Sequence, residues 1–115
     1  MKDHFGCPVQ ATSNVLAGKW KVLIAWHLSF RSYRFAELRQ LLPGVSEKVL
    51  TSQLRDLERD GVISRRVSGD APPRVDYFLT AAGEELIPVM EGMCAWGTKH
   101  LGVPPNLPRF AKAHA

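Results

Sequence analysis

Apolar residues recur at helical spacing in four successive stretches of this sequence. In the clearest stretch, Leu50, Leu54 and Leu57 stand at i, i+4 and i+7, which places all three side chains on one side of a helix. Gly18 suits the left-handed residue that ends a helix, and Pro43-Gly44 stops another helix and allows a tight turn. The pattern predicts helices over residues 11–17, 20–28, 35–42 and 46–60.

Two runs of β-branched and aromatic residues follow these helices. Residues 62–67 and 74–79 flank a segment rich in Ser, Gly, Asp and Pro, which is typical of a hairpin with a long tip. Thr80 then caps a last helix, which we expect to run to Leu101 with a kink at Pro88, because a proline ring removes one backbone hydrogen bond. We therefore expect a mostly α fold with a small β-hairpin, in the α+β class.

The order of these elements is that of a winged helix-turn-helix. A helix, a three-residue turn and a helix with Ser46 at its N-cap form the helix-turn-helix, and the hairpin directly after it forms the wing. We expect an N-terminal arm over residues 1–10 and an extended tail over residues 102–115. The domain between them, residues 11–101, ends in a helix that we expect to pair with a second copy.

The helix predicted over residues 46–60 carries a polar face opposite its leucines. A turn of 100° per residue brings Lys48, Thr51, Ser52, Arg55 and Arg59 together on that face. All but Arg59 lie near the N-terminal half of the helix, where the helix dipole favours phosphate. Such side chains donate hydrogen bonds to base edges and to phosphates, so this face is the candidate DNA-binding surface.

Arginines of the hairpin add positive charge of the right sign for DNA. These are Arg65, Arg66 and Arg74, and residues 31–74 hold nine basic side chains against six acidic ones. The layout therefore favours binding to double-stranded DNA. A winged helix that binds protein and not DNA is the alternative that the pattern leaves open.

The composition is that of one small globular domain. Its 115 residues are 45% hydrophobic and 23% charged, and the formal net charge of +4 is too small for a protein coated in positive charge. No apolar run approaches the roughly 20 residues that span a membrane, and no apolar segment typical of a signal peptide follows Met1, so we expect a cytoplasmic protein without membrane contact.

The two cysteines match no disulfide framework or zinc spacing, and no phosphate loop or catalytic histidine motif is present. We therefore expect no metal, no cofactor and no enzymatic activity.

Short motifs occur in a fixed order over residues 7–101. They are Cys7-Pro8-Val9, Gly18-Lys19-Trp20-Lys21, Arg34-Phe35-Ala36-Glu37-Leu38-Arg39, Leu42-Pro43-Gly44-Val45-Ser46-Glu47-Lys48-Val49-Leu50-Thr51, Leu54-Arg55-Asp56-Leu57-Glu58-Arg59-Asp60-Gly61, Pro72-Pro73-Arg74-Val75-Asp76-Tyr77, Leu79-Thr80 and Gly83. This ordered set resembles the HxlR-type winged-helix transcription regulators of bacteria. The resemblance implies a homodimer on a palindromic operator, with one recognition helix per half-site. It also implies that Ser46, Lys48, Thr51, Ser52 and Arg55 face the major groove and that Arg74 serves the wing.

The last predicted helix gives independent support for a dimer. Its apolar residues cover more than one helical face, which is more than a single surface helix exposes. The alternative is that these residues pack on the core of their own protomer. We expect pairing of the last helices, assisted by the first, and the candidate interface residues are Val89, Met90, Met93, Trp96 and Gly97.

Cys7 occupies the position at which redox and electrophile sensors of the resembling family hold a reactive cysteine. Reactivity requires an exposed thiolate near positive charge, and the candidate neighbours are Lys2, His4, Lys19 and Lys21. The signal would be an oxidant or a small electrophile such as a quinone or aldehyde. The alternative for Cys7 is a semi-buried residue that anchors the arm, and Cys94 is expected to pack in an apolar face.

An aromatic effector is the other candidate signal. Aromatic side chains that would line its pocket are Trp20, Trp26, Phe30, Tyr33 and Trp96, although aromatic residues at helical spacing are more often core. His27 lies on the apolar face of the second predicted helix, where a core histidine is favoured over a metal ligand.

Overall fold

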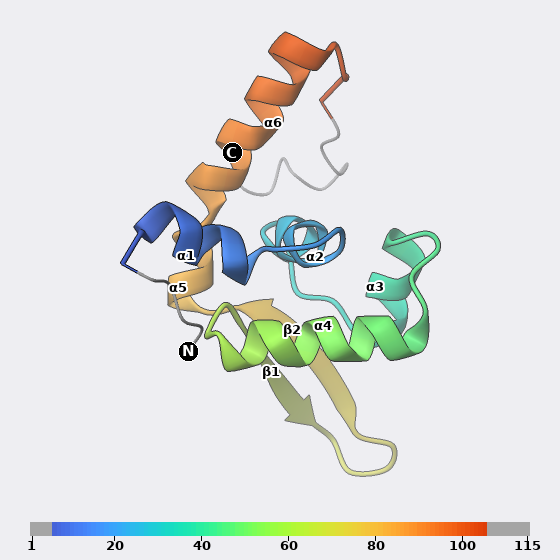
Figure 1. Ribbon diagram of the computed structural model, residues 1–115. Coiled ribbons are helices and arrows are strands. Elements are labelled where there is room, and N and C mark those ends of the chain that lie inside the picture. The colour runs from blue at the N-terminus through green and yellow to red at the C-terminus, as the bar shows by residue number, and fades with distance from the viewer. Residues whose placement is uncertain (1–5, 106–115) are drawn as a thin grey trace.

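The computed structural model describes residues 6–105 as six helices and one antiparallel hairpin (Figure 1). The elements are α1 (Pro8–Val15), α2 (Lys21–Leu28), α3 (Phe35–Leu41), α4 (Glu47–Arg59), β1 (Ile63–Ser68), β2 (Arg74–Leu79), α5 (Ala81–Glu84) and α6 (Ile87–Leu101). The α+β winged helix-turn-helix expected from the sequence is confirmed. Most of the predicted tail, residues 106–115, and the first half of the predicted arm, residues 1–5, lie outside the described residues.

The helix-turn-helix consists of α3, a short turn and α4. Gly44 makes the turn at a φ of 91°, a backbone conformation that side chains with a Cβ rarely adopt. Ser46 then begins α4 as its N-cap, because its Oγ accepts a hydrogen bond from the Val49 amide at 3.1 Å. These two residues mark the start of α4, the second helix of the helix-turn-helix, which is called the recognition helix in this fold.

The core lies between α2, α3, α4 and the base of the hairpin. Leu50, Leu54 and Leu57 of α4 are buried there, as their spacing predicted, and they pack in the same cluster as Ile24 of α2 and Leu38 of α3. Burial of side chains of this size contributes about 1.5–3 kcal/mol each, so the leucines hold one side of α4 firmly against the protein. The opposite side of α4 is left to solvent.

The hairpin pairs β1 with β2 in antiparallel register, from Ile63 opposite Leu79 to Ser68 opposite Arg74. Its base is tied to the helical core, because Tyr33 and Tyr77 exchange backbone hydrogen bonds at 3.1 and 2.8 Å. Its tip extends away from the helices beside α4 (Figure 1). The hairpin is therefore placed as a wing next to the recognition helix.

The segment after the hairpin differs from the single kinked helix that the sequence predicted. It forms two helices, and the break falls at Glu85 and Leu86, just before Pro88 in the first turn of α6. Proline has no N–H and is tolerated in a first helical turn, so a new helix starts there and no kink is needed. α6 then extends away from the domain, on the side opposite to the hairpin tip (Figure 1).

The first helix also differs from its prediction. It begins at Pro8, three residues before the expected start, with Cys7 as its N-cap. Proline at the first helical position explains the early start, since its φ is already helical.

Within residues 6–105, no helix has the length and apolar character needed to cross a membrane.

Candidate nucleic-acid interface

The solvent side of α4 presents a cationic and hydroxyl-bearing surface. Lys48, Ser52, Arg55 and Arg59 are exposed, and Thr51 is half-buried beside them. These residues follow one another at i+4 and i+3 steps, so they form one stripe along the helix, directly opposite the buried leucines. We refer to Lys48, Thr51, Ser52, Arg55 and Arg59 as the recognition face.

Two hydroxyl groups near this face already have partners within the helix. The Oγ of Ser46 caps the Val49 amide, and the Thr51 hydroxyl donates to the Glu47 carbonyl at 2.8 Å. The Ser46 hydroxyl is therefore a helix cap in this structure, whereas the resemblance implied a groove contact. Thr51 retains its methyl group and its hydroxyl lone pairs for another molecule.

Lys48 and Arg55 are the cations of this face without an acidic partner. None of the ion pairs among residues 6–105 includes either side chain. Both are exposed, so their charges are directed to solvent. Both charges are therefore available to a polyanion that approaches α4.

The carboxylates on the flanks of α4 are each held by a cation. Glu47 pairs with Arg39 at 3.5 Å and Glu58 pairs with Arg65 at 3.4 Å. Asp56 has two partners, because Lys21 of α2 approaches Oδ2 at 3.0 Å and Arg59 donates to Oδ1. The flanks are therefore electrically compensated, which limits their repulsion of an approaching phosphate backbone.

The wing arginines also have local partners. Arg74 bonds Asp76 through its Nε at 3.1 Å, and Arg66 lies 5.7 Å from the ring centre of Phe78. The hydrogen bond from Arg74 to Asp76 raises the pKa of Arg74, and the side chain of Arg74 is 56% exposed. All three wing arginines are exposed, so their charges still face solvent.

Lys21 is buried, although the sequence analysis took it as a cation near the Cys7 thiol. It was a candidate neighbour of Cys7, but it is buried and bound to Asp56, with only 7% of its side chain exposed. Its hydrogen bond is the largest of the influences that lower the pKa of Asp56. Lys19, the other described candidate, lies over the ring of Trp20 at 4.6 Å. Lys2 and His4 lie outside the described residues.

Cys7 is exposed and forms no disulfide, at the start of α1. The next residues, Pro8 and Val9, line a groove between α1 and α6 together with Val89 and Met93. The thiol is thus open to solvent and stands beside an apolar surface that both terminal helices share.

Four of the five candidate interface residues on α6 are accessible. Val89, Met93 and Trp96 are 47%, 53% and 57% exposed, and Gly97 is half-buried. Met90 is 2% exposed and packs in the protomer core, so it is not available to a partner in this conformation. The helical turn explains the difference, since Met90 faces α2 while Val89 and Trp96 face outward.

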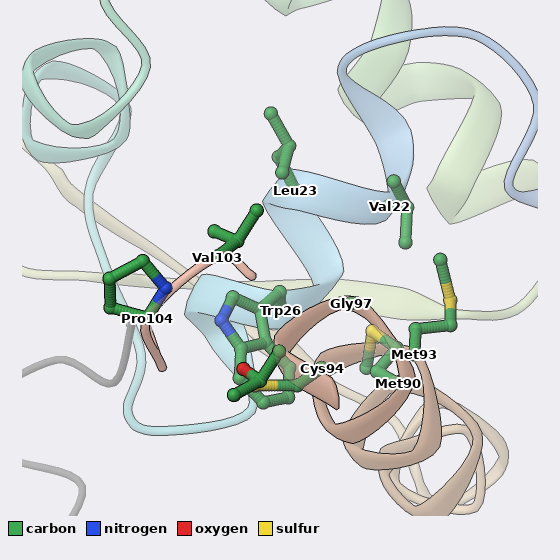
Figure 2. Close-up of a pocket in the computed structure, with 10 residues that line it drawn as sticks. Val22, Leu23, Trp26, Met90, Met93, Cys94, Gly97, Val103 and Pro104 are labelled. Atoms are coloured by element: carbon green, nitrogen blue, oxygen red, sulfur yellow. The ribbon is translucent and has the colours of Figure 1, made fainter. Parts of the chain in front are cut away.

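A cavity of about 280 Å³ lies between α2, α6 and the residues that follow α6 (Figure 2). Figure 2 shows Trp26 from α2, Met90 and Cys94 from α6, and Val103 and Pro104 around it. Of the five aromatic residues proposed for an effector pocket, Trp26 alone lines this cavity. Phe30 instead packs edge-on against Trp26 at 5.0 Å, Tyr33 is buried beside the hairpin, and Trp96 is exposed.

The described histidines form no metal site. Residues 6–105 contain no group of three side chains placed to hold a metal ion. Burial lowers the pKa of His27, and its Nδ1 is buried without a hydrogen-bond partner among the described residues. His27 is thus a partly buried residue of α2 whose charged form is disfavoured by burial, and His114 lies outside the described residues.

Comparisons with known proteins agree on the kind of protein. The model of the HxlR-like helix-turn-helix family matches residues 15–104. The HTH-type transcriptional regulator YdeP of Bacillus subtilis is 47% identical over 98 residues, which cover 85% of this chain and 77% of YdeP.

Two solved structures show the same fold. A crystal structure of the HTH-type transcriptional regulator YtcD has 42% identity, a TM-score of 0.79, and coverage of 84% of this chain and 99% of that one. The redox regulator HypR in its reduced form has 38% identity, a TM-score of 0.78, and coverage of 83% of this chain and 96% of that one.

Proposed function

Because the chain belongs to the HxlR-like helix-turn-helix family of transcription regulators, which are not enzymes, we propose that it binds double-stranded DNA through the recognition face of α4. The observation that carries this proposal is the pair of exposed cations, Lys48 and Arg55, on the side of α4 opposite its buried leucines. Arg55 is suited to bidentate contact with guanine, and Lys48 to guanine or phosphate. Arg65, Arg66 and Arg74 of the wing supply further positive charge near the duplex.

A homodimer is the form that we propose for the bound state. Val89, Met93 and Trp96 expose an apolar stripe on a helix that extends from the domain, and Val9 of α1 adds to it at 79% exposure. Apolar patches of this kind mark protein interfaces. A palindromic operator with half-sites about one DNA turn apart requires two recognition faces on one side of a dimer, and pairing of the α6 helices about a two-fold axis is the arrangement that we propose to meet this requirement.

Selection from a random-sequence duplex library tests the DNA-binding proposal. Wild-type protein is expected to enrich an inverted repeat, and Arg55→Ala is expected to lose the enrichment at defined positions of each half-site. Lys99→Ala on α6 removes the same charge away from α4 and serves as the matched control. A protein that enriches no sequence and shows no salt-dependent affinity for any duplex contradicts the proposal and favours a protein-binding winged helix.

The dimer has its own test by sedimentation equilibrium. Trp96→Glu places a charge on the apolar stripe and is expected to shift the wild-type dimer to monomer and to weaken operator binding. Thr98→Glu, on the half-buried side of α6 that lines the cavity, tests whether the cavity side also takes part. A wild-type protein that stays monomeric at micromolar concentration overturns this part of the proposal.

Thiol gating at Cys7 is a second candidate function, favoured by the exposure of this thiol beside the α1–α6 groove. The Cys7 thiolate would form an S–C bond with a ring carbon of the quinone, and the resulting enolate would take up a proton from water and tautomerise to a hydroquinone thioether. Treatment with benzoquinone is expected to weaken operator binding by the wild type and to leave Cys7→Ser unaffected. An equal response of both proteins rules out Cys7 as the sensor and points to Cys94 or another group.

A further inference from the structure

Asp56 stands between a buried cation and an exposed one. Its Oδ2 lies 3.0 Å from the Lys21 Nζ, and its Oδ1 accepts a hydrogen bond from the Arg59 guanidinium. The exposed fractions of the three side chains are 7% for Lys21, 25% for Asp56 and 60% for Arg59. One carboxylate thus serves two positive charges that differ sharply in their access to solvent.

Lys21 cannot give up this contact without cost. Its ammonium is buried, and a buried charge without a partner is strongly disfavoured. Lys21 is also the first residue of α2, where the positive end of the helix dipole opposes a cation. Both effects make Asp56 the required partner of Lys21.

Arg59 is free to exchange its partner. Its side chain is mostly exposed, and a surface ion pair of this kind contributes little to stability because water screens both charges. Arg59 follows Arg55 by four residues, so the two guanidinium groups belong to the same stripe of the recognition face. A DNA phosphate near that stripe would compete with Asp56 for Arg59.

The outcome of that competition depends on Lys21. When Arg59 leaves, the Asp56 carboxylate keeps one cation, so no uncompensated negative charge faces the phosphate backbone. Without Lys21, the carboxylate would have Arg59 as its only cation and would retain it. The arrangement therefore releases Arg59 at little electrostatic cost.

We propose that Arg59 is a further phosphate-contact residue of the recognition face, and that Lys21 is a positioning residue that frees Arg59 by holding Asp56. This inference rests on the proposed binding of DNA by α4. It assigns a role in DNA affinity to Lys21, a buried residue of α2 that does not contact the duplex. Lys21 and Arg59 should therefore act on the same contact.

The test is the salt dependence of binding to the selected operator, measured by fluorescence anisotropy from 50 to 200 mM KCl. A substitution that removes one phosphate contact per protomer removes two from the proposed dimer, so the slope of log affinity against log salt concentration should fall by about 1.8. Arg59→Gln is expected to show this loss and a several-fold weaker affinity at low salt. Lys99→Gln, with the same change of charge on α6, is expected to keep the wild-type slope.

Lys21→Met is expected to show the same reduced slope as Arg59→Gln, even though residue 21 is buried and does not itself contact the duplex. The double variant Lys21→Met/Arg59→Gln should lose no more slope than either single variant. Asp56→Asn should keep the wild-type slope, because Arg59 is then released. Lys21→Met/Asp56→Asn should return the slope to the wild-type value, a rescue that general damage to the fold does not produce.

Distinct outcomes overturn distinct claims. A wild type without salt-dependent binding overturns the proposed function itself. If the wild type binds but Arg59→Gln keeps its slope, Arg59 contacts no phosphate. If Arg59→Gln loses slope while Lys21→Met does not, or Lys21→Met/Asp56→Asn fails to recover it, Lys21 does not control Arg59. If circular dichroism shows that Lys21→Met is unfolded, Asp56→Asn decides the question. A slope below that of the wild type for Asp56→Asn contradicts the release of Arg59.

Discussion

Arg65 of β1 pairs with Glu58 of α4 at 3.4 Å, so the wing and the recognition helix are joined by an ion pair on their exposed side. The contact neutralises the Glu58 carboxylate and holds the Arg65 side chain beside α4. The wing and the recognition face can therefore act as one surface toward a duplex.

Arg55 is expected to contribute more to operator binding than Arg65. Arg55 has no acidic partner among the described residues, whereas Arg65 must leave Glu58 to contact DNA. Arg55→Ala should cost about 1–3 kcal/mol on the operator and relax discrimination at one base position, and Arg65→Ala should cost less. Competition binding with operator and scrambled duplexes measures both effects. Equal weakening of Arg55→Ala on every duplex identifies Arg55 as a phosphate contact only.

Ser46 is expected to contribute to the stability of α4 as its N-cap. Ser46→Ala removes the acceptor for the Val49 amide and should lower the free energy of unfolding by about 0.5–2 kcal/mol. Ser46→Asp preserves an acceptor at the cap and should retain most of the stability. Urea denaturation monitored by circular dichroism compares the two. If Ser46→Ala is as stable as Ser46→Asp but binds the operator poorly, the hydroxyl serves DNA and not the cap.

Gly83 is expected to tolerate no larger side chain. A Cβ at this position would lie 2.1 Å from the Val62 carbonyl oxygen, and that oxygen is a backbone atom that cannot rotate away. Gly83→Ala should lower the free energy of unfolding by about 1–3 kcal/mol, because α5 must shift away from the hairpin base. Thermal denaturation measures the change. A melting temperature equal to that of the wild type contradicts the close packing of α5 on Val62.

His27 is expected to make stability depend on pH below neutrality. Burial lowers its pKa below the ordinary value of 6.5, so the unfolded chain takes up a proton at a higher pH than the folded protein does. Its contribution is therefore fully present above pH 6.5 and is lost as the pH falls. Urea denaturation from pH 7.5 to 5 should show this loss for the wild type and a smaller loss for His27→Leu. Equal slopes for the two proteins would show that other groups are responsible.

The periodicity of the sequence was sufficient to predict the orientation of α4. Leu50, Leu54 and Leu57 repeat at helical spacing, and burial of that side leaves Lys48 and Arg55 exposed without any knowledge of distant residues. The turn before the helix was also predictable, because Gly44 and Ser46 act within a few residues of their own positions.

The partner of Lys21 could not be predicted in this way. Lysine is ordinarily exposed, and nothing near it in the sequence indicates that α2 turns it inward against α4. Met90 illustrates the same limit on α6, since its apolar neighbours Val89 and Met93 look alike in sequence yet remain accessible. Such distinctions depend on where one helix crosses another, and the crossing is set by the packed core as a whole.

The central claim is that the recognition face of α4 lies in the groove of a duplex. Cleavage of the bound DNA by a reagent attached to that face tests the claim most directly. The variant Ser52→Cys, made together with Cys7→Ser and Cys94→Ser, would carry an iron chelate that cuts DNA close to its point of attachment. Two groups of cuts, one in each half-site and about one DNA turn or 34 Å apart, are the predicted result. Undiminished operator binding without localised cuts would contradict the claim.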